Sequence, residues 1–422
     1  MKIISLGLIA VFLLSACVSK QHFRTDISAI PCQVNSQQNC LHANLIQNED
    51  DAFTLGFVEI DDQGQFYDNR QVETLIKTLK NQTQAQYVTL YVHGWHHNAD
   101  ADDSSISRFK TLLTDTKRRH PQLSVTGIYI GWRGETLTLP GLRALTFADR
   151  KLVSEEVGRN ALLDFLLQVE TAVKVQGNAE NRLITIGHSL GASVTFNALY
   201  PILLQHLLQP EDNSVRKGFG DLVVLINPAF EATRYTTLRH AAQRYAQQFQ
   251  FSPQQNPLLV VATSANDLIT KLDFSLSRQV TTLFEQHRML DNHTQELQAP
   301  LSEWELDTTS IGHFHPFITH RLQTHAALTD QYHCSTSTGW LNLAVERQTT
   351  TLATGWDTGD NISQPALFTD SSQLQVSHLQ NSTNYDPYWV VQTDSSIFPT
   401  HGFITQPNFW CFIDQLVEQA VD

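Results

Sequence analysis

The sequence is short of basic residues and has no basic stripe. Its 28 lysines and arginines are outnumbered by 42 acidic residues, which gives a formal net charge of −14 over 422 residues. Because nothing in such a chain offsets the phosphate charge of DNA or RNA, the composition argues against a nucleic-acid-binding protein. It is also neither disordered nor fibrous, since 41% of the residues are hydrophobic and 17% are charged. A globular protein with a sizeable core is expected.

The apolar run at the N-terminus is too short to span a membrane. Residues 3–14 are almost wholly apolar and follow the positive charge of Lys2, which is typical of a secretory signal. The run ends in Leu14-Ser15-Ala16-Cys17, which resembles the lipobox of bacterial lipoproteins. This resemblance implies a signal peptide of residues 1–16, lipidation of the Cys17 thiol and an anchor in the bacterial cell envelope, with the outer membrane favoured by the residue after the cysteine. The alternative is an ordinary secretory signal followed by a chance cysteine.

Cysteine is scarce, with five in the chain. The four beyond Cys17 are Cys32, Cys40, Cys334 and Cys411, and their spacing matches no zinc site. In an oxidising compartment an even number allows two disulfides, in any of three pairings. A Cys32–Cys40 bridge would close a small loop, and a Cys334–Cys411 bridge would tie an inserted region to the last helix. Free buried thiols are the alternative.

The chain from residue 17 to residue 51 is rich in glutamine and asparagine and has no steady apolar period. This composition predicts a polar tether between the lipid anchor and a folded domain at 52–422. The domain is expected to open with a hairpin, in which a strand at 53–60 pairs with residues 65–67.

Strands and helices alternate through most of the domain. Short apolar runs predict strands at 87–92, 125–131, 183–186, 221–226, 258–262 and 388–391. Helical spacing predicts a helix that is capped by Asp103 or Ser104 and runs to Arg119, and further helices at 146–173, 231–249 and 409–421. The alternation predicts an α/β fold with a mainly parallel, doubly wound sheet covered on both faces. Residues 269–387 fit no single sheet element and are expected to form a long cap-like or lid-like insertion before the last strand.

The strand at 183–186 runs directly into Gly187-His188-Ser189-Leu190-Gly191 and then into a helix. A nucleophile elbow needs this arrangement, because the serine takes a strained turn that exposes its hydroxyl, and small residues two positions away let strand and helix approach. In this context the segment resembles the α/β-hydrolase superfamily, in its lipase and esterase branch.

A second motif, His93-Gly94-Trp95, ends the strand at 87–92. In that superfamily the residue after such a glycine supplies one amide of the oxyanion hole, which implies Trp95. The other amide would come from Leu190, immediately after the nucleophile.

The acid and the base of a triad are expected in loops that follow later strands. Asp267 follows the strand at 258–262 and is the predicted acid, although it could instead cap a helix; Glu231 and Asp273 are its competitors. His401 follows the last strand and precedes the closing helix, as the order of the superfamily requires. The alternative base is His313, in a Gly-His loop.

Two further features admit other interpretations. Arg133 could lie near the site, but a structural arginine paired with Glu135 or Asp149 is favoured. A metal site in the loop after residue 92 is a weaker hypothesis, on the residues His93, His96, His97, Asp100, Asp102 and Asp103.

The sequence therefore predicts a serine hydrolase that cleaves carboxylic esters, of small molecules or lipids, through Ser189, His401 and Asp267 and an acyl-enzyme, without a cofactor. A metal-dependent hydrolase is one alternative. Another is an envelope lipoprotein that uses the same fold as a non-catalytic binding scaffold, since fold does not fix function.

Overall fold

The computed structural model describes twelve stretches of the chain: residues 22–34, 40–48, 53–136, 146–208, 215–249, 251–252, 254–290, 301–324, 362–367, 374–379, 385–402 and 406–421. The expected signal peptide and Cys17 lie outside these stretches. No helix in the described part of the chain is long and apolar enough to cross a membrane.

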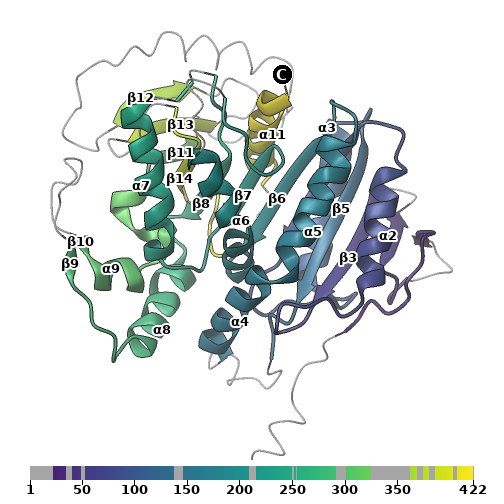
Figure 1. The fold of residues 1–422 in the computed structure, drawn as a ribbon, viewed down its shortest axis with the longest axis horizontal. Helices are drawn as coiled ribbons and strands as arrows, with labels where there is room; N and C mark the ends of the chain where they lie inside the picture. Colours follow the sequence, from purple (N-terminus) through teal and green to yellow (C-terminus); the bar gives the residue numbers. More distant parts are fainter. Residues whose placement is uncertain are drawn as a thin grey trace, which may run out of the picture.

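A mixed sheet runs through the molecule (Figure 1), with twelve strands in the order β1-β2-β3-β5-β4-β6-β7-β8-β14-β11-β13-β12. All neighbours from β3 to β11 are parallel, as expected for an α/β protein. Antiparallel pairs occur toward the two edges, at β2–β3, β11–β13 and β13–β12. The strands are β1 (Cys32–Val34), β2 (Leu45–Asn48), β3 (Phe53–Ile60), β4 (Gln86–Val92), β5 (Ser124–Trp132), β6 (Arg182–His188), β7 (Leu222–Ile226), β8 (Leu259–Ser264), β11 (His320–Thr324), β12 (Ile362–Leu367), β13 (Leu374–Leu379) and β14 (Tyr388–Thr393).

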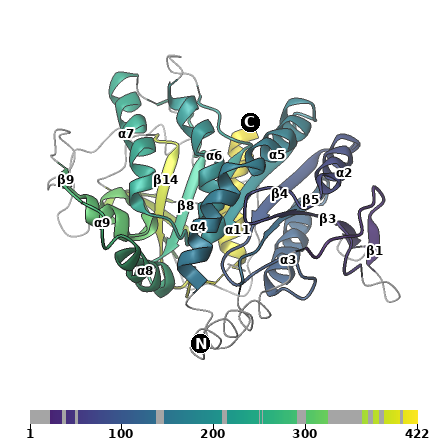
Figure 2. The same ribbon diagram turned by 60° about the horizontal axis from the view of Figure 1, so that its bottom comes forward.

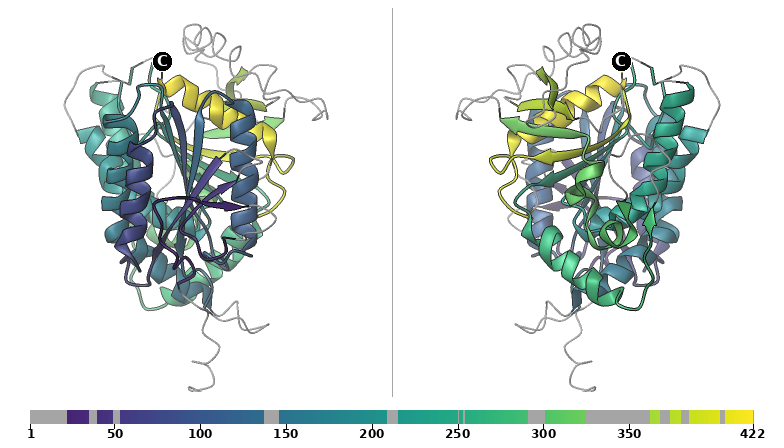
Figure 3. Two further views of the ribbon diagram at one scale, coloured as in Figure 1. Left: turned by 90° about the vertical axis from the view of Figure 1, so that its right-hand side faces the viewer. Right: turned by 90° about the vertical axis from the view of Figure 1, so that its left-hand side faces the viewer.

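Helices cover both faces of the sheet, because the central strands carry apolar side chains on both sides. One face packs against α2 (Asn69–Lys80), α4 (Phe147–Arg159), α5 (Ala161–Glu170), α6 (Leu190–Leu208) and α7 (Ala232–Gln248). The other face packs against α3 (Ser104–Arg119) and α11 (Pro407–Val421), and Figure 3 shows the two layers edge-on. Successive residues of β4 alternate between the two cores, with Val88 in one and Tyr87 in the other.

The predicted helices are present, with one interruption. α3 begins at the expected cap, where the Asp103 carboxylate accepts a hydrogen bond from the Ser105 amide at 2.7 Å. The single helix expected at 146–173 is instead two helices, because Asn160 leaves the helical region at φ −105° and ψ −120°. A π-helical turn, Thr171–Val175, follows α5.

The N-terminal segment is not the structureless tether that its composition predicted. Within residues 22–34 and 40–48 it forms β1 and β2, which add to the edge of the sheet. The amides of Phe23 and Arg24 both donate to the buried Glu59 carboxylate at 2.8 Å. The prediction failed because the strands are short. Buried polar contacts attach the segment together with a few apolar side chains, such as Leu45 and Ile46 in the two cores.

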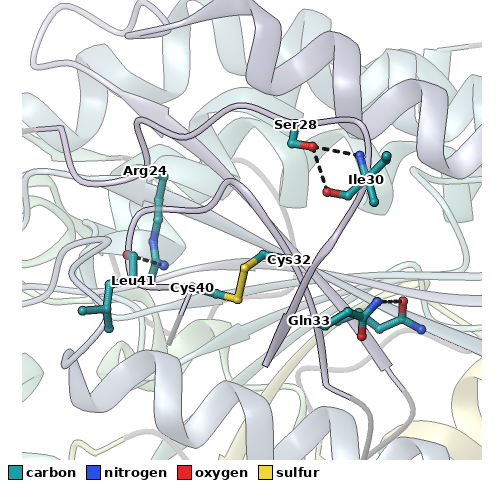
Figure 4. The surroundings of a disulfide bond; sticks show 8 residues. Arg24, Ser28, Ile30, Cys32, Gln33, Cys40 and Leu41 are labelled. Atoms are coloured by element: carbon teal, nitrogen blue, oxygen red, sulfur yellow. Dashed lines mark hydrogen bonds between the residues drawn. A yellow bond between two sulfur atoms is a disulfide. The ribbon is translucent and has the colours of Figure 1, made fainter. Parts of the chain in front are cut away.

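A disulfide between Cys32 and Cys40 closes a small loop in this segment (Figure 4), as one of the expected pairings required. Cys411 is buried in α11 and is also disulfide-bonded. Cys334, the partner expected for it, lies outside the described residues.

Two other predictions about the sheet need correction. The expected hairpin is present only in part: Ile60 and Phe66 form an antiparallel bridge and the Tyr67 amide donates to the Glu59 carbonyl at 3.0 Å, but residues 65–67 form no strand. The antiparallel strand beside β3 is β2. The region 269–387 was expected to stay outside the sheet, yet it contributes β11, β12 and β13. The pattern hid β11 because some of its residues, such as the polar Arg321 and Gln323, are only half-buried.

The rest of the described insertion forms a π-helical turn (Ile269–Asp273), α8 (Phe274–Thr281), the short pair β9 (Met289–Leu290) and β10 (Leu301–Ser302), and α9 (Glu303–Thr308). α8 contacts α4, and Figure 2 shows the two helices side by side. The rings of Phe147 and Phe274 meet edge-on there, with their centroids 6.4 Å apart.

Candidate active site

Ser189 occupies the sharp turn between β6 and α6. Its φ is +56°, the strained conformation that the sequence predicted for an elbow. The turn is fixed by backbone hydrogen bonds, since the Ser189 amide donates to the Ile226 carbonyl at 3.0 Å and the Ala229 amide donates to the Ser189 carbonyl at 3.1 Å. The β7 strand therefore holds the elbow from the side.

The glycines of the elbow are required by close approach. A Cβ on Gly187 would lie 2.7 Å from Cα of Ala192, and one on Gly191 would lie 2.2 Å from the Val92 carbonyl oxygen. Both contacts are shorter than real Cβ atoms allow, so strand and helix can meet here only without side chains at these positions.

Ser189, His401 and Asp267 lie in one line of hydrogen bonds. Ser189 Oγ and His401 Nε2 are 2.8 Å apart, and His401 Nδ1 and Asp267 Oδ2 are also 2.8 Å apart. An ionised carboxylate only accepts hydrogen bonds, so Nδ1 carries the proton and Nε2 accepts from the serine hydroxyl. The three side chains come from the elbow, from the loop after β8 and from the loop after β14.

The Asp267 carboxylate is fully buried and is surrounded by donors. Its Oδ1 accepts from the amides of Ile269 at 3.1 Å and Thr270 at 3.2 Å, and its Oδ2 accepts from His401 and from the Thr270 hydroxyl. Burial by itself would raise the pKa of this carboxyl group, but the hydrogen bond and charge of His401, together with those from Thr270, outweigh burial and lower the pKa. Asp267 is therefore ionised at neutral pH.

The other candidate base, His313, does not contact Ser189 in the described structure. Its Nε2 lies 3.0 Å from the Thr270 hydroxyl oxygen, and that hydroxyl donates to Asp267 Oδ2, the oxygen that His401 also contacts. The structure thus brings both candidate histidines to the same carboxylate, one directly and one through a threonine.

The loop after β4 lies against the elbow. A Cβ on Gly94 would lie 2.8 Å from Cβ of Ser189 and 2.9 Å from the His188 carbonyl oxygen. The loop is held by the end of β5, because the Trp132 indole donates to the His93 carbonyl at 2.9 Å and the His96 amide donates to the Gly134 carbonyl at 3.1 Å.

Trp95 and Leu190, the expected oxyanion donors, flank the nucleophile from these two segments. Within the described stretches, neither of their backbone amides donates a hydrogen bond to another residue. Leu190 is the first residue of α6, where amides have no acceptor inside the helix. An oxyanion hole requires two uncommitted amides close to the nucleophile. Leu190 follows Ser189 directly in the chain, and Trp95 follows Gly94, which lies against Ser189.

The backbone of the His401 loop is held by three residues whose part in the site the sequence did not reveal. His188 Nε2 donates to the His401 carbonyl at 2.8 Å, and the Asn227 side-chain amide donates to the same carbonyl at 3.2 Å. Ser264 Oγ donates to the Phe398 carbonyl at 2.6 Å. Burial, with the nearby His401, lowers the pKa of His188 to about 3, so this donor stays neutral. The available signal was their position, since each ends or directly follows a parallel strand.

The competitors for the acid are engaged elsewhere. The buried Glu231 carboxylate pairs with Lys151 at 2.6 Å, Arg234 at 2.7 Å and Arg278 at 2.9 Å. Burial opposes its ionisation, but these three cations lower its pKa to about 2. Asp273 is exposed at the start of α8.

Arg133 is a paired structural arginine as expected, and it pairs with the carboxylate of Asp62. Asp149 pairs with Arg150 at 2.6 Å instead. Arg150 also reaches Asp62 at 3.0 Å, which joins the end of β5 to α4 through one shared carboxylate.

The residues of the weaker metal hypothesis make local contacts. His97 Nδ1 lies 2.8 Å from the Asp103 carboxylate, which also caps α3, and His93 Nε2 accepts from the Trp132 amide at 3.1 Å. One group in the described part of the chain, Glu285, His287 and Asp307, has ligand atoms within 4.8 Å of one another. Arg278 already binds both oxygens of Asp307, at 2.8 and 2.9 Å.

Neither models of known protein families nor curated protein sequences give a match to this chain. Its function has to be inferred from the site itself.

Proposed function

We propose that the protein is a serine hydrolase that cleaves carboxylic esters, as lipases and esterases of the α/β-hydrolase superfamily do. The observation that carries the proposal is the pair of 2.8 Å hydrogen bonds from Ser189 to His401 and from His401 to Asp267. Two features support it: the strained serine between a parallel strand and a helix, and the chain order serine, aspartate, histidine, which α/β-hydrolases share.

In the proposed reaction, His401 Nε2 takes the proton of the Ser189 hydroxyl as the oxygen attacks the ester carbonyl. Asp267 keeps the proton of His401 on Nδ1 and stabilises the imidazolium. His401 then gives its proton to the leaving alcohol, and an acyl-enzyme remains. A water molecule deprotonated by the same imidazole attacks the acyl group and restores the serine.

The backbone amides of Trp95 and Leu190 would bind the oxyanion of each tetrahedral intermediate. A donor of this kind typically accounts for about 3 kcal/mol of the barrier. Because both donors belong to the backbone, no substitution of the Trp95 or Leu190 side chain removes them directly. The reaction as proposed needs no cofactor.

The first test is labelling of the whole protein with a fluorophosphonate, together with assays on nitrophenyl esters of increasing chain length. We expect Ser189 to be labelled, and Ser189→Ala and His401→Ala to lower kcat by roughly 10⁴-fold or more. A folded protein that takes up no label would instead be the binding scaffold. An active His401→Ala variant with an inactive His313→Ala variant would assign the base to His313.

We also propose, from the lipobox-like segment, that lipidated Cys17 anchors the enzyme in the bacterial envelope. Phase partition of the expressed protein in detergent tests this proposal. The wild type should enter the detergent phase and Cys17→Ala should remain in the aqueous phase. Equal partition of the two proteins would refute the anchor.

A further inference from the structure

His313 and Thr270 form a second chain of hydrogen bonds that ends on Asp267. Asp267 Oδ2, the oxygen that accepts from His401 Nδ1, also accepts from the Thr270 hydroxyl. Because the carboxylate has no proton to give, the threonine must be the donor in this contact. The lone pairs of the threonine oxygen then face His313 Nε2 at 3.0 Å, so His313 donates from Nε2.

The position of His313 is fixed by the fold. It lies in the 3-10 turn Ile311–His313, whose contacts include β8 and β14, the two strands that precede the loops of Asp267 and His401. A Cβ on Gly312 would lie 1.8 Å from Oγ1 of Thr263 in β8. Only glycine therefore lets the turn approach closely enough for the next residue, His313, to reach Thr270.

The arrangement requires a neutral His313 imidazole, and the surroundings of His313 favour that state. Burial lowers the pKa of His313, and the charged or titratable neighbours that act on it are Asp267, Lys271 and His401. A neutral imidazole has one N–H, and the contact with Thr270 places it on Nε2. The order of donors then runs from His313 to Thr270 to Asp267.

We propose that Thr270 and His313 are positioning residues of the triad, which orient the carboxylate of Asp267 toward His401. This inference rests on the proposed hydrolase function and adds two residues to it. Without the Thr270 hydroxyl, Asp267 keeps its contacts to two backbone amides on Oδ1, but Oδ2 has only the imidazole of His401 as a partner. The carboxylate can then rotate away from the in-line geometry that catalysis requires.

The main test compares Thr270→Val, which keeps the shape and removes the hydroxyl, with Thr270→Ser, which keeps the hydroxyl. Thr270→Val loses a hydrogen bond to a charged group. We therefore expect its kcat to fall about 10- to 100-fold, with KM unchanged. We expect Thr270→Ser to stay within about threefold of the wild type. The acid limb of the kcat/KM profile should move to lower pH in Thr270→Val, because a carboxylate that has turned away from His401 stabilises the protonated imidazole less.

The outcomes that would overturn the inference are distinct. Wild-type kcat and pH profile in Thr270→Val would refute it, and so would an equal loss in Thr270→Ser, which would indicate a packing role. If Thr270→Val does not fold, two variants of His313 make the same comparison. His313→Ala removes the donor to Thr270, and His313→Gln retains a side-chain donor.

A spectroscopic measurement separates this inference from the hydrolase proposal. The ¹⁵N shifts of the His313 ring in the wild-type protein should report a neutral Nε2–H tautomer, and a proton on Nδ1 would contradict the inference even in an active enzyme. If the wild type takes no fluorophosphonate label, the hydrolase proposal fails. If Ser189 is labelled and Thr270→Val is labelled at the same rate, only the positioning role fails.

Discussion

Gly94 shows how strictly single residues are constrained at this site. Its missing side chain leaves the space in which the loop after β4 lies against the nucleophile, since a Cβ would approach within 2.8 Å of Cβ of Ser189. Real Cβ atoms do not come so close, so a side chain here would push the loop away from the elbow. The Trp95 amide would move with it.

We therefore expect Gly94→Ala to fold but to lose about 100-fold or more in kcat/KM, the scale of losing one oxyanion donor. Gly402→Ala is a matched control next to His401, because the nearest atom to its Cβ among the described residues would be Thr400 Oγ1, at an ordinary 3.8 Å. Ester hydrolysis and thermal unfolding of both variants check the prediction. Full activity in Gly94→Ala would show that the loop does not depend on this approach.

Single residues of the site could be predicted from the sequence where they stand in a local pattern, and could not be predicted where their role depends on contacts between distant parts of the chain. Ser189 stands in a five-residue motif, and Asp267 and His401 follow strands that an apolar run identifies. Thr270 carries no such signal, because its importance depends on contacts with Asp267 and His313 together. The choice between His401 and His313 stayed open in the sequence because His401 follows the last strand while His313 stands in a Gly-His loop, and both are positions in which a catalytic base can occur.

Among the elements, the loop after β14 depends most on its neighbours. It carries His401, and β6, β7 and β8 each contribute a donor to its backbone through His188, Asn227 and Ser264. Asn227 also accepts from the Ser264 amide at 2.9 Å and has a φ of +44°. The ends of three parallel strands thus position one loop.

Asn227→Gly should slow the enzyme without unfolding it, because glycine adopts the positive φ readily while the donors to the carbonyls of Thr400 and His401 are lost. Two neutral hydrogen bonds correspond to about a tenfold or larger loss in kcat. Asn178→Gly, at an exposed turn, is the control. The rate of fluorophosphonate labelling is the measurement, and equal rates in Asn227→Gly and the wild type would contradict this account.

The elements that the sequence predicted well are those buried on both sides. The centres of four strands are continuous apolar or β-branched runs, namely β4, β6, β7 and β8. These runs are distinguished from helices by their short length and by the residues that flank them. β1 and β2 were missed because each is only three or four residues long. β11 to β13 lie at the other edge, where polar residues interrupt the pattern.

At the scale of the whole molecule, the last helix, α11, is linked to β4 and α3, which lie in the first half of the chain. Asp414 of α11 is fully buried; it accepts from the Tyr87 hydroxyl at 2.5 Å and pairs with Arg119 of α3. Burial alone would raise the pKa of this carboxyl group, but Arg119, His120 and Tyr87 lower it to about 2. One carboxylate therefore links the C-terminal helix to β4 and α3.

This linkage predicts how stability depends on pH. A carboxyl group whose pKa is lower in the folded protein stabilises that state above its ordinary pKa of about 4 and loses the effect as pH falls toward 2. Asp414→Asn should lower the free energy of unfolding at pH 7 by roughly 3 kcal/mol, because the buried Arg119 loses its counter-charge. It should also weaken the acid sensitivity between pH 4 and pH 2.

Urea unfolding at pH 7 and pH 3 measures both effects. Glu73→Gln, at an exposed position of α2, should leave both values near those of the wild type. A variant Asp414→Asn as stable as the wild type at pH 7 would show that the buried pair contributes nothing net, as some buried ion pairs do.

The two roles weighed for Asp267 in the sequence, cap of the following turn and partner of a histidine, are held at once by its two carboxylate oxygens. The Asp267 carboxylate therefore does two things at once. It orders the segment that starts the insertion, and it aligns the imidazole of His401. A variant that shortens or neutralises the Asp267 side chain disturbs both the turn and the imidazole. The kinetics of such a variant alone would therefore overstate what the negative charge contributes to turnover. Thr270, which touches only one of the two oxygens with its side chain, is the better place to separate them.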